Sequence, residues 1–163
     1  MRNTAKKMAI QFRAAAATED TIVAQHFYQM WRDLAVPADR LLPDWQSQTV
    51  EFIAQARNTL GFQAFIAIAD TGEAVGSASC QIFSGLYPLI LSPGYQQRGY
   101  LWGVYVDASY RRQGIATKLT LMAIAHLKQL GCTHALLNAS PAGQPLYETL
   151  GFEPGNLMSL RLK

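Results

Sequence analysis

The segment from residue 100 to residue 138 constrains the fold more than any other part of this sequence. Residues 100–106 are rich in aromatic and β-branched side chains, which favour a strand. Residues 114–130 are predicted to form a long helix that ends at Gly131, and residues 134–138 have the length and apolarity of a buried strand. Two strands joined by a helix form a βαβ unit, so we expect these strands to pair in parallel.

Further elements are expected on both sides of this unit, from apolar periodicity and turn residues. In chain order they are a strand at 10–14, helices at 18–34 and 44–60, a hairpin of strands at 62–69 and 74–83, a short helix at 145–150 and a last strand at 158–162. This order predicts an α/β protein with a mixed, twisted sheet and helices on both faces. The length suits a single domain over residues 1–163.

Composition narrows the classes of function. Half of the 163 residues are hydrophobic and 15% are charged, which favours a folded globular chain. The net charge of +3 suits a partner that bears phosphates, but the basic residues are scattered rather than gathered in a stripe. The chain has no apolar run long enough to span a membrane, and no apolar segment of the signal-peptide kind follows Arg2, Lys6 and Lys7.

Cysteines and histidines give no sign of a disulfide framework or a metal site. Cys80 and Cys132 lie in apolar stretches without CxxC spacing, so we expect two buried free thiols and a reducing, cytoplasmic location. The alternative is a disulfide between them. His26, His126 and His134 are far apart in sequence and lack the spacing of metal ligands, so no metal is expected.

The turn between the strand ending at Val106 and the helix beginning near Gly114 has the features of an anion site. The first backbone N–H groups of a helix have no partner within it, and they point outward at the positive end of its dipole. Gly114 lets a phosphate approach the backbone, and Arg111 and Arg112 add positive charge. The alternative is an ordinary strand–turn–helix with two solvated arginines. The sequence contains neither a P-loop nor a dinucleotide-binding fingerprint.

Two motifs in this region resemble the GNAT family of N-acetyltransferases. Residues 111–116, Arg-Arg-Gln-Gly-Ile-Ala, match the family's [Q/R]xxGx[G/A] signature for the pyrophosphate of CoA. Residues 136–152 resemble the family's fifth strand and following helix, and end in Tyr-Glu-Thr-Leu-Gly-Phe. The resemblance covers nearly the whole chain. It implies acetyl-CoA as cosubstrate, fourth and fifth strands that splay apart, and direct acetyl transfer to a primary amine in a ternary complex.

The resemblance also implies which residues act. Those expected to bind acetyl-CoA are Val104, Tyr105, Val106, Arg111, Arg112, Gln113, Gly114, Ile115, Ala116, Thr117 and Asn138. Tyr147 matches the family's general acid, which would protonate the departing CoA thiolate. The alternative for Asn138 is a strand-end cap, and for Tyr147 it is packing in the core.

One departure from the family concerns the general base. Many members carry a carboxylate on the fourth strand, yet residues 100–106 hold no Asp, Glu or His, and Tyr100 lies near the position concerned. The base must therefore come from elsewhere, or water must carry the proton away. Asp44, Glu51 and His26 lie in the region that covers the acceptor, although a solvated helix residue is the favoured interpretation for each.

The acceptor is expected to be a small-molecule or peptide amine. The region that sets acceptor specificity holds several aromatic residues, which suit an amine through apolar or cation–π contact: Tyr28, Trp31, Trp45, Tyr87, Tyr95 and Tyr100. For Trp31, in the apolar stripe of its helix, core packing is the favoured interpretation. The loop at residues 84–98 is a candidate lid.

Two other functions are alternatives to catalysis, and the chain is also expected to form a homodimer. A non-catalytic acyl-CoA-binding regulatory module would explain the missing carboxylate, although Tyr147 opposes it. A basic nucleic-acid-binding domain is favoured weakly by the pI of about 9.0, but the chain has no basic stripe with interleaved aromatics. A homodimer is expected because residues 158–162 would form an apolar edge strand.

Overall fold

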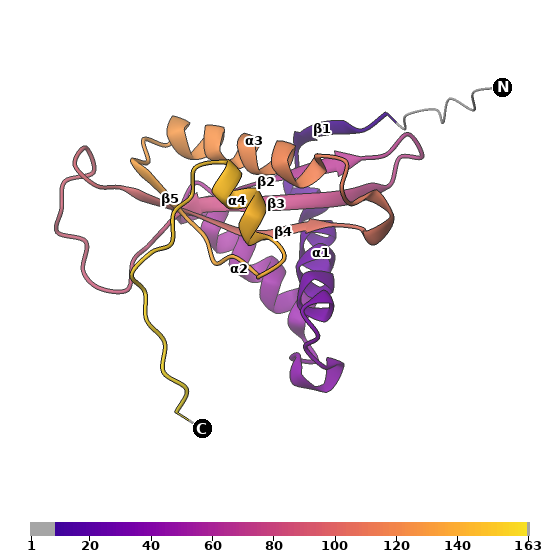
Figure 1. Ribbon diagram of the computed structural model, residues 1–163, viewed down its shortest axis with the longest axis horizontal. Helices are drawn as coiled ribbons and strands as arrows, with labels where there is room; N and C mark the ends of the chain where they lie inside the picture. The colour runs from indigo at the N-terminus through magenta and orange to yellow at the C-terminus, as the bar shows by residue number, and fades with distance from the viewer. Residues whose placement is uncertain (1–8, 163) are drawn as a thin grey trace.

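The computed structural model describes residues 9–162, which are built around a five-stranded sheet (Figure 1). Arg2, Lys6 and Lys7 lie outside this range. The strands are β1 (Gln11–Ala14), β2 (Gln63–Ile68), β3 (Ala74–Ile82), β4 (Arg98–Val106) and β5 (His134–Leu136). The helices are α1 (Asp20–Asp33), α2 (Trp45–Thr59), α3 (Ile115–Gln129) and α4 (Gln144–Thr149), with 3-10 turns η1 (Ala17–Glu19), η2 (Ala38–Arg40) and η3 (Ala108–Tyr110).

The sheet is mixed, as the order of elements predicts. The strands lie in the order β1-β2-β3-β4-β5, with antiparallel pairing up to β4 and parallel pairing between β4 and β5. Helix α3 packs on one face, where Leu101, Leu119 and Leu127 belong to the larger core cluster. Helices α1 and α2 cover the opposite face through a second cluster that includes Val23 and Ile53 (Figure 1). The predicted mixed sheet with helices on both faces is confirmed.

Strands β4 and β5 pair over only a short stretch. Their register joins Arg98 to His134 and Tyr100 to Leu136, and β5 then ends while β4 continues to Val106. The strand predicted at residues 134–138 is therefore shorter than expected. Beyond the last pair, the edge of β4 that faces β5 has no neighbouring strand among the described residues. The sheet opens there, which leaves backbone groups of β4 free to bind another molecule.

A glycine bends β4 inside this opening. Gly103 has φ of +63°, a left-handed conformation that glycine adopts without steric cost. The β3–β4 register shifts opposite it, between Ser77 and Ser79, as in a β-bulge. Bulges bend a strand and increase its twist, so this one helps to turn the end of β4 away from β5.

The predicted strand at residues 158–162 is wrong. The chain has no regular secondary structure from residue 152 to residue 162, and Leu157, Met158 and Leu160 are 77%, 92% and 82% exposed. Alternating apolar residues form a strand only where an edge is available for pairing and a core covers one face. This segment has neither among the described residues, and it runs away from the sheet (Figure 1).

The two cysteines differ in burial. Cys80 is buried, but Cys132 is only half-buried, so the prediction of two buried thiols holds for the first alone. Both thiols are free. None of the helices in residues 9–162 is long and apolar enough to cross a membrane.

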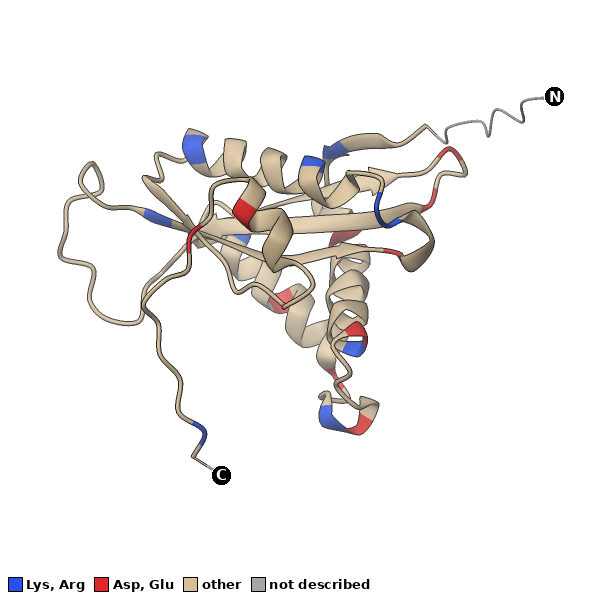
Figure 2. Ribbon diagram, in the orientation of Figure 1, with Lys and Arg blue, Asp and Glu red and all other residues tan. Residues whose placement is uncertain are grey.

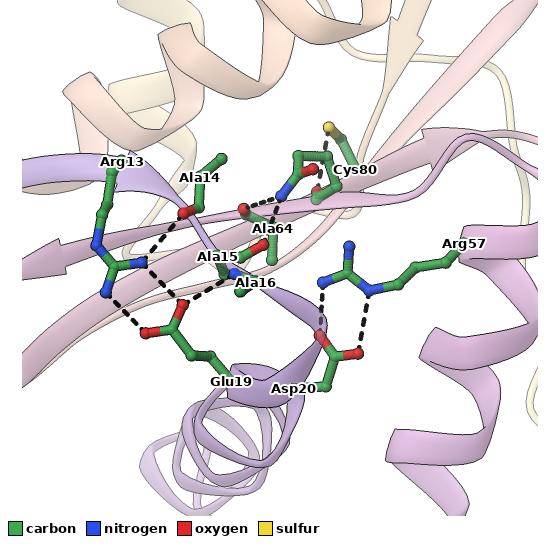
Figure 3. Close-up of polar contacts among 10 residues, drawn as sticks. Arg13, Ala14, Ala15, Ala16, Glu19, Asp20, Arg57, Ala64 and Cys80 are labelled. Carbon is green, nitrogen blue, oxygen red and sulfur yellow. Dashed lines mark hydrogen bonds and ion pairs between the residues drawn. The ribbon is translucent and has the colours of Figure 1, made fainter.

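A partly buried ion pair joins the two helices that cover one face of the sheet. Arg57 of α2 donates two hydrogen bonds, of 3.0 and 2.6 Å, to the carboxylate of Asp20 at the start of α1 (Figure 3). The side chains are 19% and 7% exposed. The guanidinium of Arg57 also lies 5.0 Å from the ring centre of Phe62. A second pair, between Arg13 and Glu19, lies nearer the surface (Figure 3).

We predict that Asp20→Ala lowers the free energy of unfolding by about 3 kcal/mol, because it leaves the guanidinium of Arg57 partly buried without its partner. Urea denaturation followed by circular dichroism measures this change. Arg13→Ala is the control, since it breaks the more exposed pair and should have a much smaller effect. Equal effects of the two variants would show that the Asp20–Arg57 pair does not hold α1 on α2.

Candidate active site

A cleft of about 1350 Å³ opens where β4 and β5 part. One end is lined by α1 and α2, the middle by β4, and the other end by the start of α3, by α4 and by the loop at residues 137–143. The cleft therefore joins the free edge of β4 to the predicted anion-binding turn. The cleft is large enough, and extended enough, for two molecules to bind in it side by side.

The turn before α3 presents a row of unpaired backbone donors. Gly114, the N-cap of α3, has φ of +80°, and Arg112 has φ of +62°. The first hydrogen bond of the helix runs from the N–H of Lys118 to the carbonyl of Gly114. Within residues 9–162, the N–H groups of residues 112–117 have no acceptor. Unpaired donors at the positive end of a helix suit a phosphate, so the local geometry fits the pyrophosphate of CoA.

Arg111 differs from the simple expectation of a charge held free for phosphate. Its guanidinium forms an ion pair with Asp33 at the end of α1, and its Nε donates to the carbonyl of Val106 at 2.8 Å. Arg111 thus fastens α1 to the end of β4 beside the anion turn. Arg112 is exposed and lines the cleft, so its charge faces the site.

Tyr147 projects from α4 into the same cleft. Its ring packs edge-on against Phe152, with the ring centres 5.8 Å apart, and the side chain is half-buried. Burial raises the pKa of the Tyr147 hydroxyl above its usual value near 10. In the described part of the chain, no side chain or carbonyl hydrogen-bonds that hydroxyl. A protonated phenol that faces a cleft without a protein partner can donate to a bound molecule.

The structure gathers almost all of the predicted site residues in one place. The residues that line the cleft are Val104, Tyr105, Val106, Arg111, Arg112, Gly114, Ile115, Ala116, Thr117, Asn138 and Tyr147. Gln113 is exposed on the turn and is not part of the cleft wall. Asn138 lies two residues beyond the end of β5, in the loop. The roles assigned to these residues stay predictions.

The three candidate bases do not reach the cleft. Asp44 is exposed and accepts a hydrogen bond from Gln48, and Glu51 is exposed on α2, so both are surface residues as expected. The expectation of a solvated His26 is wrong, because this residue is buried. Its ring nitrogens lie 2.9 Å from Ser77 Oγ and 3.2 Å from the Ala74 carbonyl, and burial lowers its pKa.

Only some of the predicted aromatic residues face the cleft. Trp31 and Tyr100 line it, while Tyr28 and Trp45 stack on each other with ring centres 4.4 Å apart. Trp31 is 40% exposed, so the core position favoured for it is wrong: it lies near the end of α1, where the helix passes the sheet. Tyr87 and Tyr95 are exposed on the loop after β3, and residues 84–97 contribute nothing to the cleft wall, which leaves the lid without support.

Sequence reasoning missed several residues of the cleft wall. Phe27, Phe52, Gln81 and Trp102 line the end beneath α1 and α2. Gln81 gave a usable signal, because an amide inside an apolar strand must find a partner, and it accepts a hydrogen bond from Trp102 Nε1 at 3.1 Å. The alternation of β4 places Trp102 on the face opposite Leu101, which also pointed to α1 and α2.

Family comparison agrees with this geometry. A sequence model of the acetyltransferase (GNAT) family matches residues 23–152. The chain belongs to this family. GNAT acetyltransferases use acetyl-CoA, and the cleft offers the features that such a substrate needs: free strand backbone and unpaired N–H donors at a helix start. In residues 9–162, no group of three or more His, Cys, Asp or Glu side chains is placed to hold a metal.

Individual GNAT proteins resemble the chain in sequence or fold. Glucosamine 6-phosphate N-acetyltransferase of Trypanosoma brucei brucei is 34% identical over 82 residues, which cover 50% of this chain and 52% of that protein. The chain thus spans about half the length of the curated relative it matches. A GCN5-related N-acetyltransferase from Ralstonia eutropha superposes with a TM-score of 0.80 at 23% identity, over 94% of this chain and 99% of that one.

A second solved structure shows the same fold. It is a predicted acetyltransferase with acetyl-CoA from Clostridium acetobutylicum, with a TM-score of 0.80 and 19% identity, and the match covers 94% of this chain and 97% of that one. The GNAT fold is therefore confirmed for this chain.

Gly114→Val is predicted to weaken CoA binding by about tenfold or more, the effect of losing roughly 1.4 kcal/mol of contacts. The new side chain would stand at the anion turn, where backbone N–H groups must approach phosphate. Isothermal calorimetry of CoA binding measures the change.

Gly131→Val is the matched control. Gly131 has φ of +79° at the other end of α3, and a Cβ at either glycine meets nothing within 4 Å, so the two variants carry similar backbone strain. We expect similar losses of stability and a loss of CoA affinity for Gly114→Val alone. Equal CoA affinity in both variants would remove the turn from the binding site.

Proposed function

We propose that this GNAT protein transfers the acetyl group of acetyl-CoA to a primary amine, by direct attack within a ternary complex. The observation that carries the proposal is one continuous cleft, which joins the anion turn, the free edge of β4, the Tyr147 hydroxyl and the chamber beneath α1 and α2. A thioester and an amine bound at its two ends would meet beside Tyr147.

Acetyl-CoA would bind along the α3 side of the cleft. The N–H groups of residues 112–117 and the charge of Arg112 would hold the pyrophosphate. The pantetheine arm, which carries amide groups, would pair with the backbone of β4 at residues 104–106, and Asn138 would contact it from the opposite side. Gly114 would allow the close approach.

The chemistry needs a nucleophile and a proton donor. The amine nitrogen attacks the thioester carbonyl carbon, a C–N bond forms and the C–S bond breaks. Tyr147 would give its proton to the departing thiolate, or stabilise the charge on sulfur as it develops. The raised pKa of Tyr147 serves this role, because the hydroxyl keeps its proton across the physiological pH range.

The amine must also lose a proton, and the cleft offers little to accept it. The only carboxylate in the wall formed by residues 9–162 is Asp33, which is paired with Arg111. We therefore propose that the amine reacts in its neutral form and that water in the open cleft carries the proton away. The reaction rate should then rise with pH as the acceptor amine itself deprotonates.

The same absence of a base supports the competing function, a regulatory module that binds acyl-CoA without turnover. The two functions differ in one measurement, the release of free CoA thiol when amines are added.

The single-domain organisation and the cytoplasmic location stay predictions. The free thiols of Cys80 and Cys132 support the cytoplasmic location.

The homodimer also stays a prediction, now with a different structural basis. Apolar side chains at residues 157–162 are exposed, and burying them against a second copy would be favourable.

Light scattering should report about twice the 18.0 kDa chain mass. Replacing Met158 and Leu160 together by Ser should yield monomers, whereas Leu42→Ser, at a site 62% exposed on another surface, should not. A monomeric unmodified chain at micromolar concentration would overturn the prediction.

Tyr147→Phe is predicted to lower kcat by ~10²–10⁴-fold, the usual contribution of general acid catalysis. The Kd for acetyl-CoA should hardly change, because the hydroxyl interacts mainly with charge that develops on sulfur in the transition state. Tyr28→Phe is the control, since it removes a hydroxyl from an aromatic stack outside the cleft. Full turnover in a well-folded Tyr147→Phe protein would exclude Tyr147 as the acid.

A further inference from the structure

The acceptor end of the cleft carries almost no charge. Three charged residues line the cleft wall of the described chain: Asp33, Arg111 and Arg112. Asp33 and Arg111 neutralise each other in an ion pair, and Arg112 belongs to the anion turn. No residue of β4 between Arg98 and Asp107 is charged (Figure 2). An acceptor that enters beneath α1 and α2 therefore meets no free ionic partner in residues 9–162.

The wall of this end is mostly aromatic. We name it the acceptor chamber and define it by five rings and one amide: Phe27, Trp31, Phe52, Tyr100, Trp102 and Gln81. Trp102 is at its centre. Phe27 packs edge-on against it with ring centres 5.0 Å apart, and Phe52 does so at 5.7 Å. Phe27 in turn packs edge-on against Trp31 at 6.0 Å. Rings held by one another in this way form a fixed apolar surface that suits a flat or aliphatic body.

Gln81 is the buried amide of the chamber. Gln81 is 7% exposed, and its Oε1 accepts the hydrogen bond from the Trp102 indole at 3.1 Å. That bond fixes the orientation of the amide and leaves its NH₂ group without a hydrogen-bond partner in the described chain. A neutral donor can satisfy a hydroxyl, ether or carbonyl oxygen, but it cannot balance a phosphate or a second ammonium group.

We propose that the acceptor is a primary amine on an aromatic or aliphatic body, without a phosphate and without a second charge. This inference rests on the proposed acetyl transfer. A sugar phosphate would have to bury a dianion in a chamber that has no cation for it, and a polyamine or aminoglycoside would bury further ammonium groups without carboxylates. The chain therefore differs in acceptor from the glucosamine 6-phosphate enzyme that it partly resembles in sequence.

The test compares kcat/KM for five amines with the full chain and acetyl-CoA, by release of CoA thiol. The amines are 2-phenylethylamine, tyramine, glucosamine 6-phosphate, spermidine and kanamycin. We expect the two aryl amines to exceed the other three by about tenfold or more. A preference for glucosamine 6-phosphate, spermidine or kanamycin would overturn the acceptor class and leave acetyl transfer intact. Binding of CoA without turnover of any amine would overturn the proposed function and the acceptor class with it.

A matched pair of variants locates the preference in the chamber. Phe52 and Leu121 are 49% and 46% exposed, but only Phe52 lines the cleft. Phe52→Ala should raise KM for 2-phenylethylamine by about tenfold, with a much smaller effect on propylamine, because only the larger body reaches the lost ring. Leu121→Ala should change neither value. Equal effects of Phe52→Ala on both amines, or none, would contradict the assignment of the chamber to the acceptor.

Discussion

The point at which β4 and β5 stop pairing determines the rest of the site. Three residue pairs join these strands, and beyond Tyr100 the backbone of β4 loses its neighbour on that side. Buried peptide groups without partners are costly, so an opening of this kind persists only where water or a ligand can reach it. The bulge at Gly103 bends β4 within this opening, so main-chain groups of the strand face a molecule that enters the gap.

The same opening explains why the anion turn and the acceptor chamber share one cavity. Helix α3 returns the chain from β4 to β5, so its start lies near the end of β4, beyond the last β4–β5 pair. Helices α1 and α2 approach β4 from the other face, and Arg111 ties the end of α1 to the carbonyl of Val106. The Arg111 guanidinium thus links the two halves of the cleft, one built from backbone and the other from aromatic rings.

The sequence predicts the backbone half far better than the aromatic half. The anion turn depends on local features, namely Gly114 and the start of a helix, and a short motif records them. The acceptor chamber depends on which faces of α1, α2 and β4 meet, and only the tertiary fold decides that. Trp31 shows the difficulty, since a helical stripe predicts a buried face but not the point at which the helix passes the edge of the sheet. The strand predicted at residues 158–162 is wrong for a related reason. Their alternation of apolar residues favours a strand, but a strand also needs a sheet edge to pair with, and periodicity does not reveal one.

The difference between a backbone-built donor site and a side-chain-built acceptor chamber affects what relatives can tell us about the acceptor. Donor binding, as proposed, uses main-chain groups and one glycine, so it would tolerate wide change in side chains, and proteins only 19–23% identical to this chain share its fold. The acceptor chamber uses side chains alone, and each substitution there changes its charge or shape. A ring cluster centred on Trp102, with one amide from Gln81, disfavours anions, because a phosphate brought into it loses hydration and gains no cation as partner. The acceptor must therefore be read from the chamber of this chain, whatever its relatives bind.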